Sequence, residues 1–331
     1  MKFKNLVFTA ATCMLTSCAT HHRDLSLPSW NETPVKQRLT HFLQKEVNQI
    51  PVADRIAVFD MDGTLVCEKP WGIETMVSIH KLLEMGEKDA TVRQTVEYQY
   101  AKKLNENPRD TSVLNHLYDN GQNYPLNLIL KTFDGADCEE YIRFANQCLS
   151  TQKHFDHHRV YTDMFYQPML ELINALRQKQ FQIYVVSASM QGIVWGICPE
   201  VLKLERDHLI GIRHPKQVTF PKGGPVRYTL QAGMMSPVNN YEGKAINIYD
   251  HIGKVPVVAV GNALSDFGMF HMAECSPHPH LSLLLHHDDA EREYVYSPSH
   301  GGNYNWQDTI RHYNWIQADM SKEFKVVWKK K

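Results

Sequence analysis

The sequence predicts an α/β protein whose core is a doubly wound parallel sheet, with a helical cap domain inserted after the first strand. Three short apolar runs, at residues 56–59, 182–187 and 256–261, predict the sheet. Each run is rich in β-branched residues and ends in polar ones, which is typical of a strand buried on both faces. Segments with helical periodicity separate the runs, as connections between parallel strands require.

Composition and charge limit the functions that the chain can have. It has 331 residues, a hydrophobic fraction of 43% and a formal net charge of −1. The length suits one large α/β domain or two smaller ones. Because a near-neutral chain has no electrostatic attraction for a phosphate backbone, we expect no nucleic-acid partner.

Residues 1–17 are predicted to be a lipoprotein signal peptide. Two lysines precede an apolar stretch at residues 6–15, which is too short to span a bilayer as a stable anchor. The following Leu15-Thr16-Ser17-Cys18 resembles a bacterial lipobox, which implies cleavage before Cys18 and acyl chains such as palmitate on that cysteine. Several acyl chains would anchor the protein in a membrane, so we expect it in the bacterial cell envelope, at the outer membrane or the periplasmic face. The alternative is an ordinary secretory signal with an incidental cysteine.

Residues 18–50 are predicted to be a tether followed by a helix. Residues 19–33 are mostly polar, which suits a linker between a lipid anchor and a folded domain. Residues 34–48 place apolar side chains on one helical face. The first strand follows after a proline.

The first strand ends in a pair of carboxylates. Residues 56–59 lead directly to Asp60 and Asp62, and Gly63 then lets the backbone turn. Two carboxylates so close repel each other, so one of them holds a proton or a cation lies between them. Asp60 could attack phosphorus as a nucleophile, and Asp62 could protonate the leaving oxygen and then activate water. The alternative is a turn with two solvated aspartates, and the full string with its buried strand argues against it.

Residues 67–164 are predicted to form a helical cap over this site. Helical periodicity covers four segments of the insert, residues 73–85, 90–104, 113–118 and 138–149. Glu68 lies close enough to the aspartates to meet a cationic group of a substrate. Aromatic side chains of the insert, Trp71 among them, could hold a quaternary ammonium by cation–π attraction. The alternatives are a surface glutamate and aromatic residues of a hydrophobic core.

The second strand ends in Ser187-Ala188-Ser189. A hydroxyl and backbone N–H groups before a helix can bind phosphate oxygens, so Ser187 and Ala188 are candidate phosphate-binding residues. Ser189 is expected to cap the following helix, and a cap is the alternative reading of Ser187 as well. Further on, residues 209–213 and 226–231 predict a small hairpin.

Two more features complete the predicted site. A lysine that opens a helix beside an anionic site would balance its charge. Lys244 holds that place, with Lys222 as its rival. The third strand is followed by Asn262 and Asp266, whose side-chain oxygens suit Mg²⁺.

Taken in order, the four stretches resemble the four motifs of the haloacid dehalogenase (HAD) superfamily, whose members are mostly phosphatases. The matching residues are Asp60 and Asp62, Ser187, Lys244, and Asn262 with Asp266. The resemblance implies a Rossmann-like core at residues 51–66 and 165–331, with the cap between. It also implies Mg²⁺ held by Asp60, by the backbone carbonyl of Asp62, and by Asn262 or Asp266. The family has an aspartate where this chain has Asn262, so it stays open which of the last two residues contacts the metal directly.

Two further stretches narrow the resemblance. Cys67-Glu68-Lys69-Pro70 and residues 285–294 resemble the phosphoserine-phosphatase-like branch that includes bacterial phosphorylcholine phosphatases. The implied function is Mg²⁺-dependent hydrolysis of a small phosphomonoester through an aspartyl-phosphate, with phosphocholine or another amine-bearing phosphate as substrate. The second stretch contains His286 and His287, and the alternative interpretation of these two histidines is that they are structural. For the whole chain, the alternatives are a phosphotransferase or mutase, a dehalogenase, and a non-catalytic surface lipoprotein.

Overall fold

The computed structural model describes residues 27–109, 124–299 and 303–329. The predicted signal peptide, Cys18 and the predicted helix at residues 113–118 lie outside these ranges. Among the described helices, none is long and apolar enough to cross a bilayer.

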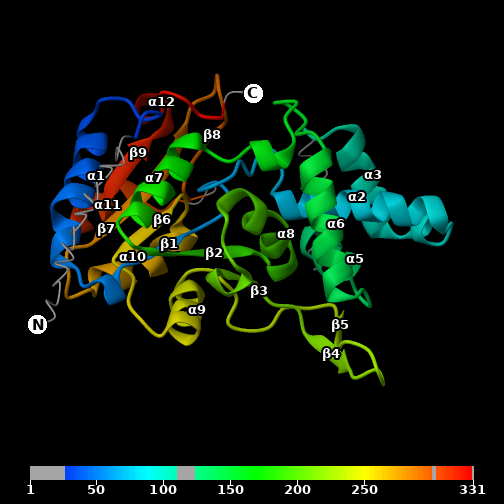
Figure 1. The fold of residues 1–331 in the computed structure, drawn as a ribbon. Helices are drawn as coiled ribbons and strands as arrows, with labels where there is room; N and C mark the ends of the chain where they lie inside the picture. Colours follow the sequence, from blue (N-terminus) through cyan, green and yellow to red (C-terminus); the bar gives the residue numbers. More distant parts are fainter. Residues whose placement is uncertain (1–26, 110–123, 300–302, 330–331) are drawn as a thin grey trace, which may run out of the picture.

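Seven strands of the described residues form one sheet in the order β3-β2-β1-β6-β7-β8, with β9 also paired to β7 (Figure 1). Neighbouring strands are parallel except for the β7–β8 pair. Their bounds are β1 Ile56–Phe59, β2 Gln182–Met190, β3 Leu209–Ile212, β6 Val258–Gly261, β7 Leu281–Asp288, β8 Val295–Tyr296 and β9 Ile316–Asp319. This parallel sheet, flanked by helices, confirms the predicted fold class.

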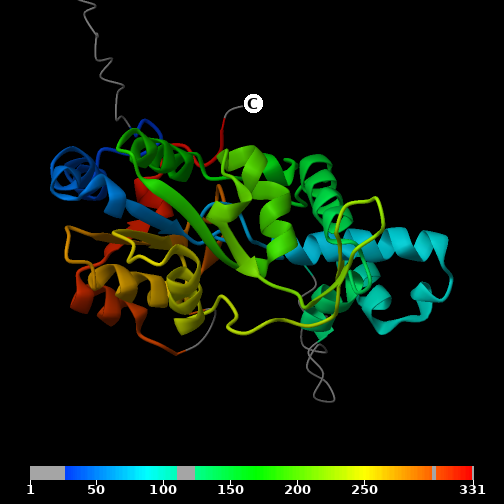
Figure 2. The same cartoon turned by 60° about the horizontal axis from the view of Figure 1, so that its bottom comes forward.

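Both faces of the sheet are covered by helices. Along β1, Ala57 and Phe59 face one hydrophobic core while Ile56 and Val58 face the other, as alternation along a strand requires. Figure 2 shows one face covered by α1 and α7 and the other by α9, α10 and α11. The bounds of these helices are α1 Pro34–Gln44, α7 Gln167–Gln178, α9 Glu242–Ile252, α10 Phe267–Glu274 and α11 Trp306–Tyr313.

The strand register brings three strand ends together. Phe59, the last residue of β1, is paired with Val185 of β2 and Val260 of β6. The residues that follow Phe59, Val185 and Val260 therefore lie side by side at one edge of the sheet, and those after Val185 still belong to β2. Open α/β sheets bind their ligands at this edge.

The helices of the insert gather at one side of the sheet in both views (Figures 1 and 2). They are α2 Ile73–Lys88, α3 Val96–Glu106, α5 Tyr124–Thr132 and α6 Cys138–Thr151. Three of them match predicted segments, whereas α5 was not predicted. Helix α8 (Gln191–Leu202) packs against α6, and Gly196 of α8 has no room for a Cβ because Ala145 and the α6 backbone lie within 3.2 Å. The division of the chain into core and cap stays a prediction.

Two sequence predictions differ from the structure. Residues 27–33, expected to belong to the tether, are bound to the core, because Trp30 is 1% exposed and its Nε1 donates to the Pro168 carbonyl at 3.0 Å. The segment at 209–213 forms β3 instead of one arm of a hairpin, since its apolar side chains are buried in the sheet. The hairpin pairs β4 (Lys216–Thr219) with β5 (Arg227–Leu230).

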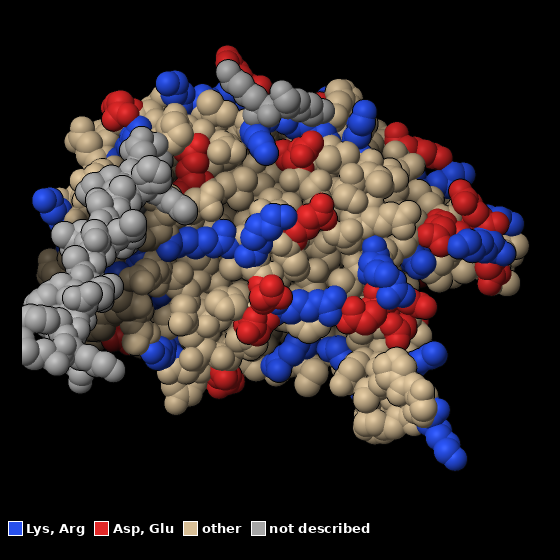
Figure 3. Space-filling view, viewed as in Figure 1, with Lys and Arg blue, Asp and Glu red and all other residues tan. Residues whose placement is uncertain are grey.

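Short elements fill several connections. They are helix α12 Met320–Glu323 and the 3₁₀ turns Glu46–Gln49, Val52–Asp54, Val92–Gln94, Tyr161–Asp163, Arg206–His208 and Leu264–Asp266. On the face shown in Figure 3, basic and acidic side chains are interspersed, in keeping with the net charge of −1.

Candidate active site

A pocket of about 250 Å³ opens at the edge of the sheet where β1, β2 and β6 end. Its lining combines charged and polar side chains from the predicted motifs, namely Asp60, Asp62, Glu68, Ala188, Asn240, Tyr241, Asn262, Ala263 and Ser265. A larger groove of about 650 Å³ lies nearby between α9 and α10, and its lining is mostly apolar. Convergent titratable groups mark the smaller pocket as the candidate active site.

Lys244 links two carboxylates at the base of this pocket. Its Nζ lies 2.6 Å from Asp60 Oδ1 and 2.6 Å from Asp266 Oδ1, and it is 1% exposed. Burial works against the charge on Lys244, but Asp266 and Asp60 together raise the pKa of Lys244 above its ordinary value. Burial, and after it the charge of Asp266, raise the pKa of Asp60, while Lys244 opposes that rise. The ammonium group therefore fixes the direction of the Asp60 carboxylate.

Asp62 is held by two serines of β2. Its Oδ2 accepts from Ser187 Oγ at 3.2 Å and from Ser189 Oγ at 2.8 Å. Burial raises the pKa of Asp62 to about 6, the hydrogen bond from Ser189 opposes the rise, and the charge of Glu68 adds to it. Ser189 was predicted to cap the next helix, which is wrong because β2 continues to Met190 and carries the serine into the site. Ala188 lines the pocket between the two serines.

Glu74 is a buried acid that the sequence analysis missed. It lies in the first turn of α2, is 8% exposed, and its Oε1 accepts from the Met190 N–H at 3.2 Å. Burial, followed by the charge of Asp62, raises the pKa of Glu74 to about 8, and a hydrogen bond links it to Ser189. The available signal was an acid set among apolar neighbours on the buried face of a predicted amphipathic helix.

Asn262 and Glu68 complete the wall of the pocket next to the aspartates. Asn262 Oδ1 accepts from Thr64 Oγ1 at 3.1 Å, and its Nδ2 donates to Glu68 Oε1 at 3.2 Å. Thr64 Oγ1 also lies 3.3 Å from Asp60 Oδ2. Glu68 was predicted to face the substrate, and it does line the pocket.

Asp266 is placed differently from Asn262. Its Oδ2 accepts from the N–H groups of Asn262 and Ala263, both at 2.9 Å, and its Oδ1 accepts from Lys244. Asp266 is fully buried behind the pocket and does not line it. Its carboxylate therefore orients the lysine and the loop after β6.

The donor set fits a hard divalent cation. Among the described residues, Asp62 Oδ1 is buried without a hydrogen-bond partner. Of the four carboxyl groups in or beside the pocket, those of Asp60, Asp62, Glu68 and Asp266, Lys244 pairs with those of Asp60 and Asp266. Excess negative charge and oxygen ligands are what Mg²⁺ requires.

Two candidate residues lie away from the pocket. Trp71, predicted to contact substrate, is 8% exposed and belongs to the hydrophobic core. Within the described residues its indole N–H has no partner. Lys222, the rival of Lys244, is exposed at the end of the β4–β5 hairpin.

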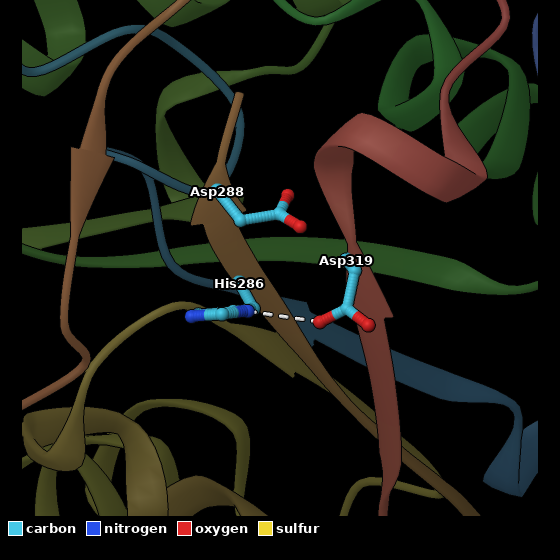
Figure 4. A group of neighbouring side chains, drawn as sticks. All are labelled: His286, Asp288 and Asp319. Carbon is cyan, nitrogen blue, oxygen red and sulfur yellow. Dashed lines mark hydrogen bonds and ion pairs between the residues drawn. The ribbon is translucent and has the colours of Figure 1, made fainter. Parts of the chain in front are cut away.

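A second group of metal-type side chains lies at the ends of β7 and β9 (Figure 4). His286, Asp288 and Asp319 place their ligand atoms within 4.8 Å of one another. Each acid already accepts protein hydrogen bonds, since Asp319 Oδ1 binds His286 Nδ1 at 2.8 Å and Asp288 binds the N–H and hydroxyl of Ser321. We therefore assign these side chains to joining β7, β9 and α12.

Comparisons with known proteins found distant similarities to solved structures. No curated protein matches the chain. A conserved protein of unknown function from Anaerococcus prevotii has 15% identity over 84% of this chain and 88% of its own, with a TM-score of 0.51. A protein of unknown function from Bordetella pertussis has 11% identity, covering 80% of this chain and 98% of its own, with a TM-score of 0.49. A probable phosphoserine phosphatase from Vibrio cholerae has 16% identity over 72% and 59% of the two chains, with a TM-score of 0.38.

A family model gives the decisive match. The model described as haloacid dehalogenase-like hydrolase matches residues 57–271, which is more than half of the chain. The matched region contains the first strand, the insert and the loop after β6. The chain belongs to the haloacid dehalogenase-like hydrolases.

Proposed function

We propose that the protein is a Mg²⁺-dependent phosphomonoester hydrolase that works through an aspartyl-phosphate. The observation that carries this proposal is the placement of Asp60 and Asp62 in one pocket with different partners. Asp60 is held by Lys244 at 2.6 Å, whereas Asp62 is held by the hydroxyls of Ser187 and Ser189. Two carboxyl groups in different environments suit different roles.

In the first step, a carboxylate oxygen of Asp60 attacks the phosphorus in line. The new bond joins Asp60 to phosphorus, and the bond from phosphorus to the leaving alcohol oxygen breaks. Protonated Asp62 gives its proton to that oxygen, so a neutral alcohol leaves. Since burial raises the pKa of Asp62 to about 6, a useful fraction of this group is protonated near neutral pH.

In the second step, water attacks the phosphorus of the aspartyl-phosphate. Asp62, now ionised, accepts a proton from the water, and the bond between Asp60 and phosphorus breaks. Inorganic phosphate leaves and both aspartates return to their initial states. Lys244 and the backbone N–H groups near Ala188 balance the charge of the phosphoryl oxygens in both steps.

The oxygen ligands proposed for Mg²⁺ are the Asp60 carboxylate, the Asp62 backbone carbonyl and Asn262 Oδ1. When bound, Mg²⁺ draws negative charge from the phosphoryl oxygens. Asp266 is the less suitable direct ligand because Lys244 and two N–H groups already occupy its oxygens. We assign it a positioning role.

The proposed substrate is a small phosphate ester that carries an amine, with phosphocholine as the example. The pocket is small, about 250 Å³, which favours a compact leaving group. Glu68 lines it beside Asp60 and Asp62, so a cationic group of the substrate would offset the repulsion among these carboxylates. Trp71 lies in the core, and the proposal gives it no contact with the substrate.

The test is release of inorganic phosphate by the full chain in detergent, with and without Mg²⁺. The panel contains phosphocholine, phosphoethanolamine, phosphoserine, glycerol phosphate and p-nitrophenyl phosphate. We expect Mg²⁺-dependent release that prefers the amine-bearing esters and is abolished by Asp60→Asn. Asp250→Asn is the matched control, because Asp250 is an exposed acid on the same helix as Lys244. Equal turnover of all esters would contradict the substrate assignment, and no release would contradict the enzyme.

We also propose that the chain is held at a bacterial membrane by lipid on Cys18. The support is the sequence around Cys18, which resembles a lipobox after a short apolar stretch. This anchor would place the proposed phosphatase in the cell envelope.

A further inference from the structure

A buried histidine of β7 contacts the turn that carries the two aspartates. His287 is 1% exposed, and its Nε2 lies 2.7 Å from the carbonyl oxygen of Gly63. Its Nδ1 lies 2.9 Å from Glu293 Oε2. Because a carbonyl can only accept, and the carboxylate accepts as well, both ring nitrogens donate. An imidazole that donates at both nitrogens carries a positive charge.

Glu293 holds this ring in place. Its Oε1 accepts from Tyr166 Oη at 2.9 Å and from Cys67 Sγ at 3.1 Å, and its Oε2 also accepts from the Tyr294 N–H at 2.7 Å. Burial works to raise the pKa of Glu293, but the hydrogen bond and charge of His287 and the other donors outweigh it and lower that pKa. The carboxylate is therefore ionised and forms a buried ion pair with the ring.

The Gly63 carbonyl is a sensitive point of the candidate active site. Gly63 follows Asp62 directly and has φ +74°, and a Cβ there would lie 2.0 Å from Asn262 Nδ2 and 2.6 Å from Glu68 Oε1. Its N–H donates to the Val66 carbonyl at 2.8 Å. The Gly63 carbonyl belongs to the peptide group between Gly63 and Thr64, and the Thr64 hydroxyl lies 3.3 Å from Asp60 Oδ2 and 3.1 Å from Asn262 Oδ1. Rotation of this peptide group therefore moves the turn that joins Asp62 to Thr64 relative to Asp60.

We infer that His287 is a positioning residue for the proposed reaction, with its Nε2–H holding the Gly63 carbonyl and Glu293 holding the ring. This inference rests on the proposed function, since it concerns the same aspartates. Misplacement of a reacting group by about 1 Å costs roughly 100-fold in rate. The neighbouring His286 lies on the opposite face of β7, because side chains alternate along a strand. It binds Asp319 (Figure 4) and has no such role.

Two substitutions separate the two bonds of His287. A glutamine places its amide nitrogen near the position of Nε2, so His287→Gln keeps a donor for Gly63 and loses the one for Glu293. An asparagine places its amide nitrogen near Nδ1, so His287→Asn keeps the donor for Glu293 and loses the one for Gly63. Both variants lose the ring charge, which makes them a matched pair.

The experiment measures kcat, KM and Tm for both variants, using the full chain in detergent and the best substrate of the panel. We expect His287→Gln to keep kcat within about threefold of the wild type and His287→Asn to lose tenfold to 100-fold, with little change in KM. We expect His287→Asn to have the higher Tm of the two variants, since asparagine still donates a hydrogen bond to the buried Glu293 carboxylate. A purely structural histidine would give the same order in both quantities, and that result would overturn the inference. His286→Gln and His286→Asn are the controls, and both should keep the wild-type kcat.

Two further measurements keep the inference testable. If the single variants do not fold, the double variant His287→Leu, Glu293→Leu removes both buried charges together, which proteins often tolerate. It should fold and lose at least tenfold in kcat, and an unchanged kcat would overturn the inference.

If the wild type releases no phosphate, the proposed function fails. The inference about His287 is then tested by amide hydrogen exchange of the peptide around Gly63. Faster exchange in His287→Asn than in His287→Gln supports the inference, and equal or slower exchange overturns it.

Discussion

At the scale of single residues, the pocket depends on which carboxyl and amide oxygens are already occupied. Both carboxylate oxygens of Asp266 already accept hydrogen bonds, one from Lys244 and the other from the N–H groups of Asn262 and Ala263. Asn262 lines the pocket and keeps its Oδ1 against the Thr64 hydroxyl, a neutral donor that can turn away. This difference separates two roles that the sequence left open.

Magnesium dependence tests these roles. We expect Asn262→Ala to raise the Mg²⁺ concentration for half-maximal activity by at least about tenfold, because it removes a ligand. We expect Asp266→Asn to lower kcat about 100-fold at saturating Mg²⁺ with little change in that concentration, because it releases Lys244. Titrations of phosphate release with Mg²⁺ provide both values. A large rise in the Mg²⁺ requirement of Asp266→Asn alone would instead make Asp266 the ligand.

Glu74 makes stability depend on pH. Its pKa is raised from the model-peptide value of 4.5 to about 8, so the folded state binds more protons than the unfolded state between these values. Stability should therefore fall as pH rises from about 4.5 to 8. Glu74→Gln removes this loss, so we expect it to stabilise the protein by about 2–4 kcal/mol at pH 8 and little at pH 4.5.

Urea unfolding at the two pH values measures this difference. Glu140→Gln is the control, because Glu140 is an exposed acid on α6. If Glu74→Gln does not raise the free energy of unfolding at pH 8, the ionised carboxylate of Glu74 is stabilised by its partners in the folded state, and the prediction is wrong.

Much of the candidate site follows from local sequence, and the exceptions have a common cause. Asp60 and Asn262 follow strands, Ser187 lies in the last part of β2, and Lys244 lies in the first turn of α9. Parallel pairing of β1, β2 and β6 brings the first three together. Glu74 and Ser189 depend on how the first helix of the insert lies against the end of β2. No periodicity in the chain specifies that long-range placement.

At the scale of elements, the contact between α6 and α8 ties the insert to the sheet. The two helices touch at Gly196, where a Cβ would lie 2.8 Å from Ala145 Cβ and 3.2 Å from backbone atoms of α6. A glycine inside a helix normally costs about 1 kcal/mol relative to alanine. Here the close approach of the backbones requires it.

Replacement of this glycine should therefore destabilise the protein. We expect Gly196→Ala to lower the free energy of unfolding by about 1–3 kcal/mol despite the better helix former, because the helices must separate. Ala145→Gly added to it should restore part of the loss, since Ala145 is the nearest contact. Denaturant unfolding of the two single variants and the double variant gives the coupling. A stabilised Gly196→Ala would show that the helices are free to adjust.

Strands β1 and β6, which are buried along their whole length, were predicted correctly. The end of β2 and the pairing partner of β3 were predicted wrongly. The apolar runs before Asp60 and Asn262 match β1 and β6 closely. The prediction ended the second strand at Ser187, whereas β2 continues to Met190 beside β3 through an irregular register. The apolar segment Leu209–Ile212 is too short to reveal its partner from sequence, because edge strand and hairpin arm share the same composition.

At the scale of the whole molecule, both ends of the described chain are joined. Trp30 packs edge-on against Phe324 with ring centroids 5.2 Å apart, and Asn31 donates to the Glu323 carbonyl at 2.8 Å. Lys325 in turn donates to the Ser29 carbonyl at 2.8 Å. The fold therefore begins no later than Leu27, close after the predicted lipid site.

Lipidation is the prediction that belongs to this scale. We expect the full chain, expressed in a Gram-negative host, to incorporate labelled palmitate and to partition into detergent. Cys18→Ala should abolish both without changing kcat on a soluble ester, because none of the described pocket residues is changed. Detergent partition and phosphate release measure the two effects, with Cys13→Ala as the control inside the signal peptide. If Cys18→Ala and the wild type partition equally into detergent, Cys18 carries no lipid, and residues 1–17 would be an ordinary export signal.

Because residues 27–33 are bound to the core, the linker between the proposed lipid anchor and the folded domain is shorter than the sequence predicts. Only eight residues, 19–26, separate Cys18 from Leu27, and the nine Cα–Cα steps between these two residues reach about 32 Å at most. That is less than the thickness of a bilayer with its headgroups. A lipidated molecule would therefore stay close to the membrane surface. Its substrates would reach it through the thin layer of water next to the lipid headgroups.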